Sequence, residues 1–399
     1  MTTIQKKISF LKDRAKFEDE EFFKNVFYNE NSSLVKREAI SSIGRKRKRE
    51  NIPFFLELLK DKDPNIVLQA IRALLVFKSD QKITNRLKEL VNHPNEIIQD
   101  VIKKEFFPTK SKDKLPHTQT YDFLKNCAVN DDVLKVLQEV PDESFHLTFT
   151  SPPYYNARDY SIYISYQEYL RFLEKVFKEV HRTTKEGRFF LLNTSPVIIP
   201  RAGRKYASKR YPIPYDLHNI LVDLGWEFID DIIWLKPEAS AKNRIGGFMQ
   251  HRKPLAYKPN SVTEMVMVYR KKTDKLIDWN IKQYPKEIIE KSLVNGSFET
   301  TNVWKINPTN HKVHSAVFPL ELCEKVIKYY SFVGDIVFDP FGGVGTLAKA
   351  AILNERLFFT TELDKNYFLA LKKELSQTLS QVKFLSSLKE FKEYKNAKS

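Results

Sequence analysis

The sequence predicts an α/β protein in which a mainly parallel sheet follows a separate, all-helical N-terminal region. From about Leu115 onward, apolar runs suited to buried strands alternate with helical patterns, and this alternation is typical of parallel sheets. The stretch from Met1 to about Lys114 contains one glycine, Gly44, and long runs of helix-compatible residues. We therefore predict a helical domain over residues 1–114 and an α/β domain over residues 115–399.

The helical region repeats its pattern about every 30 residues. Ala39-Ile40, Ala70-Ile71 and Asp100-Val101 hold corresponding positions, at spacings of 31 and 30 residues. Pro64 and Pro94 are each expected to open the next helix. Because a helix pair of this length cannot bury its apolar face alone, we expect neighbouring pairs to stack, in a pattern that resembles short HEAT-like repeats. An ordinary helical bundle is the alternative.

The composition is that of a globular chain with a strong positive charge. It is 42% hydrophobic and 29% charged, which excludes a disordered chain, and no apolar run approaches the roughly 18 residues of a membrane span. The N-terminus lacks the apolar segment of a secretory signal, and two cysteines, Cys127 and Cys323, cannot build a disulfide framework or a cysteine zinc site. These features predict a soluble, cytoplasmic protein.

The charge balance points to a polyanionic partner. Sixty-six Lys and Arg against fifty Asp and Glu leave a net charge of +16. A globular chain this basic is expected to meet nucleic acid, although a basic enzyme unrelated to nucleic acid is the alternative.

A glycine-dense turn between a strand and a helix indicates a cofactor site. The run FDPFGGVGT, residues 338–346, follows an apolar strand candidate and precedes a helical pattern. Glycines let the backbone approach a ligand that a Cβ would exclude. Glu362 stands at the end of the next strand candidate, where a carboxylate can accept hydrogen bonds from two ribose hydroxyls. The alternative is a turn that only packs a helix on its strand, with Glu362 a solvated charge.

A proline loop follows another strand candidate. The segment TSPPY, residues 150–154, comes directly after the apolar run FHLTF. Two successive prolines cannot continue a sheet ladder, so they form a rigid extended loop at the carboxyl end of the strand, where ligands bind in open α/β sheets. Such a loop offers backbone carbonyls, a hydroxyl and an aromatic face; by itself it could equally be a structural turn.

Together, TSPPY and FDPFGGVGT resemble the motifs of the amino-group DNA methyltransferases, which use S-adenosylmethionine. The segment IIWLKP at 232–237 looks like the family's strand motif, and HSAVFP at 314–319 is similar to the segment that lines the methionine end of the cofactor. The proline loop precedes the cofactor loop, an order that resembles the β-group. The resemblance covers about residues 121–370. It implies a Rossmann-like methyltransferase fold, S-adenosylmethionine as cofactor and double-stranded DNA as substrate.

The resemblance also assigns roles to individual residues. The loop that holds the target base would comprise Ser151, Pro152, Pro153 and Tyr154. The cofactor site would comprise Asp339, Pro340, Phe341, Gly342, Gly343, Gly345, Thr346, Glu362, His314 and Phe318. Relatives often carry Gly-Asp before the catalytic strand, where the aspartate approaches the adenine of the cofactor. This chain has Lys125-Asn126-Cys127 there, which leaves that role unassigned.

The expected chemistry is direct methylation of an exocyclic amine of a base flipped out of the duplex. The amine is a poor nucleophile because its lone pair is delocalised into the ring, and acceptors that bind its N–H groups can localise that lone pair. The Ser151 hydroxyl and the Pro152 carbonyl are suited to be those acceptors, and Tyr154 can stack on the flipped base. The reaction requires no metal and no covalent intermediate. Neither cysteine lies in the proline-cysteine context of cytosine C5 methylation.

The residue before Pro-Pro-Tyr predicts the target base. In the resembling family Ser usually accompanies cytosine N4 and Asp usually accompanies adenine N6, so Ser151 favours a cytosine-N4 DNA methyltransferase. Such enzymes usually serve restriction–modification systems, and a cognate endonuclease acting on the same site is the expected partner. The alternatives are an adenine-N6 methyltransferase and a nucleic-acid-binding scaffold whose methyltransferase fold is inactive.

Two basic stretches of the α/β domain are candidates for DNA contacts. In β-group relatives the target-recognition region occupies the place of residues 238–313, and a second loop at residues 200–210 carries five positive charges in eleven residues. The candidates are Arg201, Arg204, Lys205, Lys209, Arg210, Lys242, Arg244, Arg252 and Lys253. For each, a solvated surface charge is the alternative. The basic run at residues 45–49 could likewise be a solvated loop or a phosphate contact.

Overall fold

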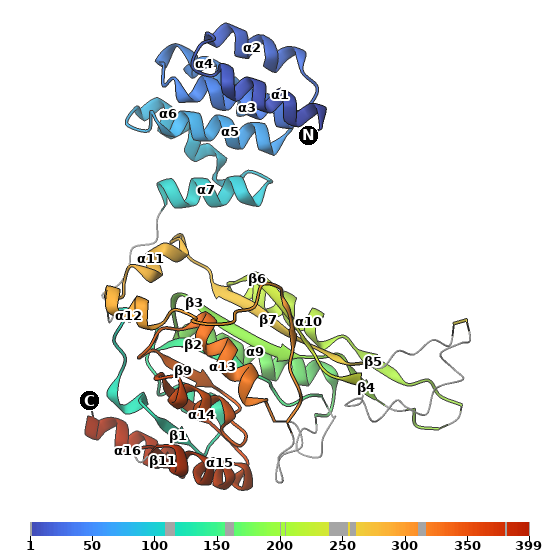
Figure 1. Ribbon diagram of the computed structural model, residues 1–399, viewed down its shortest axis with the longest axis vertical. Coiled ribbons are helices and arrows are strands. Elements are labelled where there is room, and N and C mark those ends of the chain that lie inside the picture. Colours follow the sequence, from blue (N-terminus) through green and yellow to red (C-terminus); the bar gives the residue numbers. More distant parts are fainter. Residues whose placement is uncertain are drawn as a thin grey trace. The chain divides into compact units, whose positions relative to one another are not determined.

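The chain folds into two compact units, Met1–Lys112 and Asp113–Ser399. The computed structural model describes residues 2–107, 116–155, 163–199, 201–203, 205–238, 254–255, 261–309, 317–379 and 381–398. Figure 1 shows an all-helical first unit and a second unit built around a sheet with helices on both faces. Within the described ranges no helix is long and apolar enough to cross a membrane.

The first unit is built from short helices joined by tight turns. Its α-helices are α1 (Thr3–Arg14), α2 (Glu20–Asn29), α3 (Ser33–Arg45), α4 (Ile52–Leu58), α5 (Pro64–Leu75), α6 (Gln81–Lys88) and α7 (Glu96–Phe106). Side chains of Asp63, Asp80 and Asn95 accept hydrogen bonds from the first backbone N–H groups of α5, α6 and α7. These N-caps satisfy donors that a helix cannot pair internally, which explains where the helices begin.

The repeated positions of α3 and α5 lie in one core. Ala39-Ile40 and Ala70-Ile71 are fully buried. The two helices pack so closely that a Cβ added to Gly44 would lie 3.1 Å from the Cβ of Ala73. The single glycine of this region is therefore a packing residue.

The third repeat departs from the predicted pattern. In α7 the fully buried residues are Ile98 and Ile102, whereas Asp100 is exposed. Pro94 does not open the helix, since α7 begins at Glu96 with Asn95 as its N-cap. The terminal helix thus presents a shifted face to the core.

The basic run at residues 45–49 is largely paired within the first unit. Lys48 forms an ion pair with Glu20 at 3.0 Å, and Arg49 forms one with Asp80 at 2.6 Å. These partners lie on other helices, so much of the run's charge joins neighbouring helices of the unit.

The second unit contains a nine-stranded sheet in the order β11-β1-β10-β9-β2-β3-β7-β6-β8, with β4 and β5 forming a separate hairpin. The strands are β1 (Cys127–Val129), β2 (Phe145–Thr150), β3 (Thr184–Thr194), β4 (Val197–Ile199), β5 (Lys209–Tyr211), β6 (Trp226–Leu235), β7 (Thr263–Lys271), β8 (Val303–Lys305), β9 (Ile336–Asp339), β10 (Leu357–Thr361) and β11 (Lys383–Leu385). All sheet pairings are parallel except those of β7, which runs antiparallel to β3 and β6. The carboxyl ends of the other eight strands therefore share one edge.

Helices cover both faces of this sheet. They are α8 (Val133–Leu137), α9 (Tyr166–Thr183), α10 (Ile213–Asp223), α11 (Ile277–Ile281), α12 (Lys286–Lys291), α13 (Leu320–Tyr330), α14 (Thr346–Leu353), α15 (Lys365–Thr378) and α16 (Leu388–Lys398). Side chains of α8, α9, α10 and α16 share one apolar core with the sheet, and those of α13, α14 and α15 share the other. Strand β9 alternates between them, with Ile336 and Phe338 in the first core and Val337 in the second. This layering confirms the predicted Rossmann-like α/β class.

Candidate active site

The proline loop and the glycine loop lie next to each other at the carboxyl edge of the sheet. Strand β2 ends at Thr150 and pairs with β9, which ends at Asp339. The buried Thr150 hydroxyl donates a hydrogen bond of 2.7 Å to the Asp339 carboxylate. The sequence predicted both loops at strand ends; the structure adds a hydrogen bond between the last residues of the two strands, Thr150 and Asp339.

The glycine loop is a tight turn whose backbone angles and close packing favour glycine. Gly343 and Gly345 have φ of 53° and 84°, in the left-handed region. The Gly342 N–H donates to the Thr361 carbonyl at 2.9 Å, and a Cβ added to Gly342 would lie 2.1 Å from the Thr360 hydroxyl oxygen. The loop is thus pressed against the end of β10, and α14 begins directly after it at Thr346.

Glu362 follows β10 and faces this loop. One oxygen of its carboxylate accepts from the Gly343 N–H at 2.7 Å, and the other accepts from the Asp364 N–H at 2.8 Å. An ionised carboxylate offers about four acceptor sites, so further acceptor capacity remains for ligand hydroxyls. The side chain therefore supports the loop and is suited to bind a diol.

Two carboxyl groups at this edge have raised pKa values. Burial raises the pKa of Glu362 to about 7, although hydrogen bonds from Asp364 and Gly343 partly oppose it. Burial likewise raises the pKa of Asp339 to about 6, opposed by hydrogen bonds from Thr150 and Phe341. Carboxyl groups perturbed in this way are characteristic of ligand sites.

The proline loop carries a half-buried hydroxyl and a half-buried aromatic ring. Pro152 is buried, and Ser151, Pro153 and Tyr154 are half-buried. The Tyr154 hydroxyl donates to the Glu264 carboxylate at 3.2 Å. Burial raises the pKa of this tyrosine well above its ordinary value, and the Glu264 charge adds to the effect, so the hydroxyl stays protonated.

Of the remaining predicted cofactor residues, Pro340 and Phe341 belong to the glycine loop and Phe318 packs against β2. The Pro340 carbonyl accepts from the Thr361 hydroxyl at 2.7 Å, and the half-buried Phe341 packs on the core next to it. The Phe318 ring stacks on Phe149 of β2, with ring centroids 4.5 Å apart. His314 lies outside the described residues.

A basic hairpin stands beside the proline loop. The ring of Tyr155, the residue after the loop, contacts that of Tyr211 on β5, with centroids 4.9 Å apart. Four of the predicted DNA-contact residues on or next to this hairpin are exposed: Arg201, Lys205, Lys209 and Arg210. The other five, Arg204, Lys242, Arg244, Arg252 and Lys253, lie outside the described residues.

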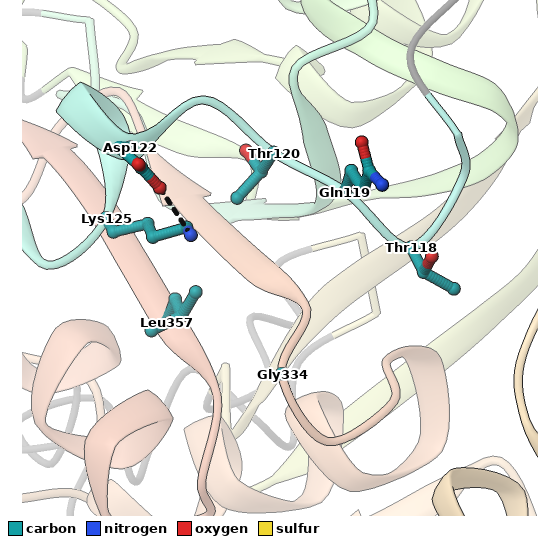
Figure 2. Close-up of a pocket in the computed structure, with 7 residues that line it drawn as sticks. All are labelled: Thr118, Gln119, Thr120, Asp122, Lys125, Gly334 and Leu357. Atoms are coloured by element: carbon teal, nitrogen blue, oxygen red, sulfur yellow. Dashed lines mark ion pairs between the residues drawn. The ribbon is translucent and has the colours of Figure 1, made fainter. Parts of the chain in front are cut away.

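The position assigned to the missing Gly-Asp pair was wrong. Strand β1 begins at Cys127, so Lys125 and Asn126 lie at the amino edge of the sheet, away from the glycine loop. Figure 2 shows Lys125 in a pocket there, paired with Asp122 at 2.6 Å and close to the first residue of β10, Leu357. The carboxyl end of β1 is followed instead by Asn130, whose amide donates to the Glu362 carbonyl at 2.7 Å. Asn130-Asp131 therefore occupies the place next to the candidate cofactor site.

Both cysteines are structural. Cys127 and Cys323 are fully buried. Burial raises the pKa of Cys127 to about 12 and that of Cys323 well above its ordinary value, so neither thiol forms the nucleophilic thiolate.

The comparisons with known proteins identify the family. Residues 145–373, which include both loops and Glu362, match the family of DNA methylases. The chain belongs to that family. Residues 21–103 match HEAT repeats, in agreement with the predicted helical stacking.

Proteins named as Type II methyltransferases resemble this chain. The chain is 29% identical over 250 residues to the Type II beta methyltransferase M.BslI of Bacillus sp. (strain NEB-606), a match that covers 60% of this chain and 26% of M.BslI. It is 29% identical over 262 residues to the Type II methyltransferase M.ScaI of Streptomyces caespitosus, covering 63% of this chain and 81% of that protein. This methylase therefore spans about a quarter of the length of M.BslI but most of M.ScaI.

A solved structure also resembles this chain. The crystal structure of TTHA0409, a DNA modification methylase homologue from Thermus thermophilus, superposes with a TM-score of 0.51 at 25% identity, covering 66% of this chain and all of that one. DNA methylases use S-adenosylmethionine as methyl donor, and the residues present fit it. The glycine turn lies at the carboxyl edge of the sheet, directly before helix α14, and Glu362 beside it is a carboxylate with further acceptor capacity.

The sequence analysis assigned no function to three residues that the structure places in the site. Thr150 was predicted only as the end of a strand, yet it joins the two loops. Glu264 and Lys236 form an ion pair beside Tyr154. Lys236 lies in the segment IIWLKP, and this was the one available signal.

Proposed function

We propose that this methylase transfers a methyl group from S-adenosylmethionine to the N4 amine of cytosine in double-stranded DNA, as the Type II modification enzyme of a restriction–modification system in the cytoplasm. The observation that carries the proposal is the proline loop Ser151–Tyr154, which begins with serine and is bonded through Thr150 to the glycine loop of a DNA methylase. The similarity to M.BslI and M.ScaI, both named Type II methyltransferases, supports the modification role.

The chain's own residues would perform the transfer by orientation. The Ser151 hydroxyl and the Pro152 carbonyl accept from the two N–H groups of the amine, which turns its lone pair toward the donor. Tyr154 stacks on the extruded base and replaces the stacking that the base loses. The bound cofactor supplies an electrophilic sulfonium methyl. The Thr150–Asp339 hydrogen bond keeps the acceptor loop in register with the loop that holds the cofactor.

The cofactor would lie along the glycine loop. Gly342 and Gly345 let the loop pack tightly against β10 and α15, which places it at the carboxyl edge beside Glu362, and Glu362 would accept from the ribose hydroxyls. The exposed cations of the β4–β5 hairpin would contact DNA phosphates beside the flipped base.

Nucleoside mass spectrometry of methylated DNA tests the proposed product. N4-methylcytosine is the expected result. N6-methyladenine as sole product would overturn the cytosine assignment while leaving the family and cofactor intact, and 5-methylcytosine would overturn the mechanism. An absence of any methylated base, with S-adenosylmethionine still bound, would favour the inactive scaffold. Sequencing DNA from an expressing host with modified-base detection would identify the recognition site.

We further propose that the HEAT-like unit is separable from the chemistry. Both loops and Glu362 lie in the unit Asp113–Ser399, which has its own core. Removal of residues 1–114 should leave S-adenosylmethionine affinity unchanged, as measured by calorimetric titration, while DNA affinity falls. Loss of cofactor binding in a truncated chain with native circular dichroism would contradict separability.

A further inference from the structure

Three tyrosine rings join the proline loop to the basic hairpin of β4 and β5. Tyr155 comes directly after the proline loop, and its ring contacts that of Tyr211 on β5, with centroids 4.9 Å apart. It also contacts the ring of Tyr166 on α9, at 5.3 Å between centroids. The rings of Tyr166 and Tyr211 contact each other at 4.5 Å. We call these three residues the tyrosine cluster; each ring contacts the other two.

The tyrosine cluster is anchored in the core of the methylase unit. Tyr155 is only 8% exposed and belongs to the apolar core that α8, α9, α10 and α16 share with the sheet. The Tyr166 hydroxyl donates a hydrogen bond of 2.7 Å to the Asp216 carboxylate on α10. Val197 of β4, which pairs with Tyr211, is buried in the same core. The hairpin is therefore attached to the same packed body as the proline loop.

The hairpin also presents cations to solvent. Lys209 and Arg210 of β5 are exposed. Lys209 and Tyr211 are two residues apart on one strand and so share a face, and the Lys209 ammonium lies 4.9 Å from the Tyr211 ring centroid. The ring of Tyr211 thus contacts both a cation available to a DNA phosphate and Tyr155, the residue that follows Tyr154.

Transfer to a flipped base requires a set distance between the phosphate contacts and the loop that holds the base. Successive phosphates of one strand lie about 3.4 Å apart along the helix axis, so a hairpin displaced by a few ångströms would meet a different phosphate. A reacting group misplaced by about 1 Å can lose about 10²-fold in rate. Phosphate binding itself tolerates movement along the strand. A firm connection between hairpin and loop therefore benefits turnover more than affinity.

We propose that the tyrosine cluster consists of positioning residues. It holds the basic hairpin at a fixed place relative to the proline loop, so that phosphates bound by Lys209 and Arg210 place the flipped base against Tyr154. The three tyrosines touch neither the base nor the cofactor in this arrangement. Packing without positioning would stabilise the hairpin but would not link phosphate binding to turnover. The inference rests on the proposed function and extends it to residues that connect DNA binding with methylation.

Tyr211 is the ring to substitute, because it contacts both other rings of the cluster and the Lys209 side chain. Tyr211→Leu keeps an apolar side chain, and kcat on saturating unmethylated plasmid DNA should fall about tenfold. The KM for S-adenosylmethionine and the affinity for a short duplex of arbitrary sequence should change less than about twofold, because the cations remain. Tyr211→Phe keeps the ring and should retain most of the activity. Tyr215→Leu on α10, at a side chain 62% exposed, is the matched control and should keep wild-type turnover.

Removal of the cations tests whether phosphate binding acts on the proline loop through the cluster. Lys209→Ala combined with Arg210→Ala should weaken affinity for the short duplex and lower kcat at saturating DNA about tenfold. In a Tyr211→Leu background the same pair of substitutions should weaken duplex affinity as much, but it should change kcat less than about twofold. Losses in kcat that multiply to about a hundredfold would mean that cations and cluster act independently, and would overturn the inference.

Wild-type kcat in Tyr211→Leu would overturn it as well. Lys209 and Arg210 are exposed, so their alanine variant is expected to fold, and wild-type kcat in that variant overturns the inference without any ring substitution. Unchanged melting temperature and S-adenosylmethionine affinity establish that each variant is folded. A wild-type chain that makes N6-methyladenine refutes the cytosine assignment and leaves this test valid. A wild-type chain that methylates no base refutes the proposed function instead, so the failures are distinguishable.

Discussion

The two ends of strand β9 each bury an aspartate, but their surroundings differ. At the amino end, the Asp335 carboxylate pairs with Arg188 and accepts from the Tyr284 hydroxyl at 2.5 Å and the Phe332 N–H at 2.8 Å. At the carboxyl end, Asp339 accepts from the Thr150 hydroxyl and from one backbone N–H, and no cation pairs with it among the residues that the structure describes.

The pKa values reflect this difference. Burial acts to raise the pKa of Asp335, but Arg188 and His146 together with the hydrogen bonds lower it below its ordinary value. Burial raises the pKa of Asp339 to about 6 because nothing of comparable strength opposes it. A fully paired buried charge holds elements together, whereas a buried carboxylate without a cation lowers stability and is retained where a ligand needs it. The buried charges at the amino edge thus stabilise the fold, whereas those at the carboxyl edge are suited to ligand binding.

The largest effect is expected at the amino edge. Arg188→Leu leaves Asp335 buried without its cation and should lower the free energy of unfolding by about 3–5 kcal/mol. All four tryptophans lie beyond residue 225, so their fluorescence during urea unfolding reports on the methylase unit alone. Arg171→Leu on the exposed side of α9 is the control, with an expected change within about 0.5 kcal/mol. Equal stability of the two variants would contradict the structural role of the amino edge.

At the carboxyl edge, substitutions should weaken cofactor binding more than folding. Gly343→Val introduces a β-branched side chain at a φ of 53°, next to the ligand path. Glu362→Ala removes the ribose acceptor at a cost of about 1–3 kcal/mol in S-adenosylmethionine affinity, measured by calorimetric titration. Glu374→Ala on α15 removes a carboxylate whose ion pair, within the described part of the chain, is with Lys349, and this variant should bind S-adenosylmethionine normally. If Gly343→Val and Glu362→Ala both bind S-adenosylmethionine as tightly as the wild type, the cofactor lies elsewhere.

The elements around the site could be predicted because their signals are local. All six residues of β2 are buried, and the sequence signal of such a strand is a short run of mainly apolar residues bounded by a turn, here FHLTFT before two prolines. The glycine and proline loops were likewise recognisable, since their backbone conformations restrict the residue types that can occupy them.

The missing parts of the site depend on pairing between distant strands. Glu264 lies at the carboxyl edge because β7 runs antiparallel to β3 and β6. The apolar pattern of EMVMVYR predicts a strand but does not indicate whether that strand is parallel or antiparallel to its neighbours. Strand β1 has three residues, Cys127–Val129, too few for a periodic signal, and so Lys125-Asn126-Cys127 was assigned to the wrong end of it. Thr150 gained its role from the register of β2 and β9, which no single segment encodes.

A smaller effect on activity is expected when the hydrogen bond that joins the proline loop to the glycine loop is removed and both loops are kept. Thr150→Val keeps the shape of the side chain but removes the donor to Asp339, at an expected cost of about 1 kcal/mol in kcat/KM. Thr150→Ser restores the hydroxyl and should restore most of the activity. Steady-state methylation kinetics provide the measurement. Equal activity of the valine and serine variants would mean that the hydrogen bond does not couple the loops.

The smallest effect concerns pH. The pKa of Glu362 is about 7, so its carboxylate is ionised above that pH and protonated below it. Both of its oxygens already accept backbone N–H groups, and a proton on either one would face a donor, so the ionised form is the one that binds the ribose. The affinity for S-adenosylmethionine should therefore fall as pH decreases through 7, by about fourfold between pH 8 and pH 6.5.

Glu362→Gln isolates this titration, because the amide has no ionisable group while the amino group of the cofactor and Asp339 titrate as before. The ratio of wild-type to variant affinity should be largest at pH 8 and should shrink toward pH 6. Calorimetric titrations at several pH values measure it. A ratio that stays constant over this range would mean that the Glu362 carboxylate only supports the glycine loop, and the carboxyl edge would then serve the fold as the amino edge does.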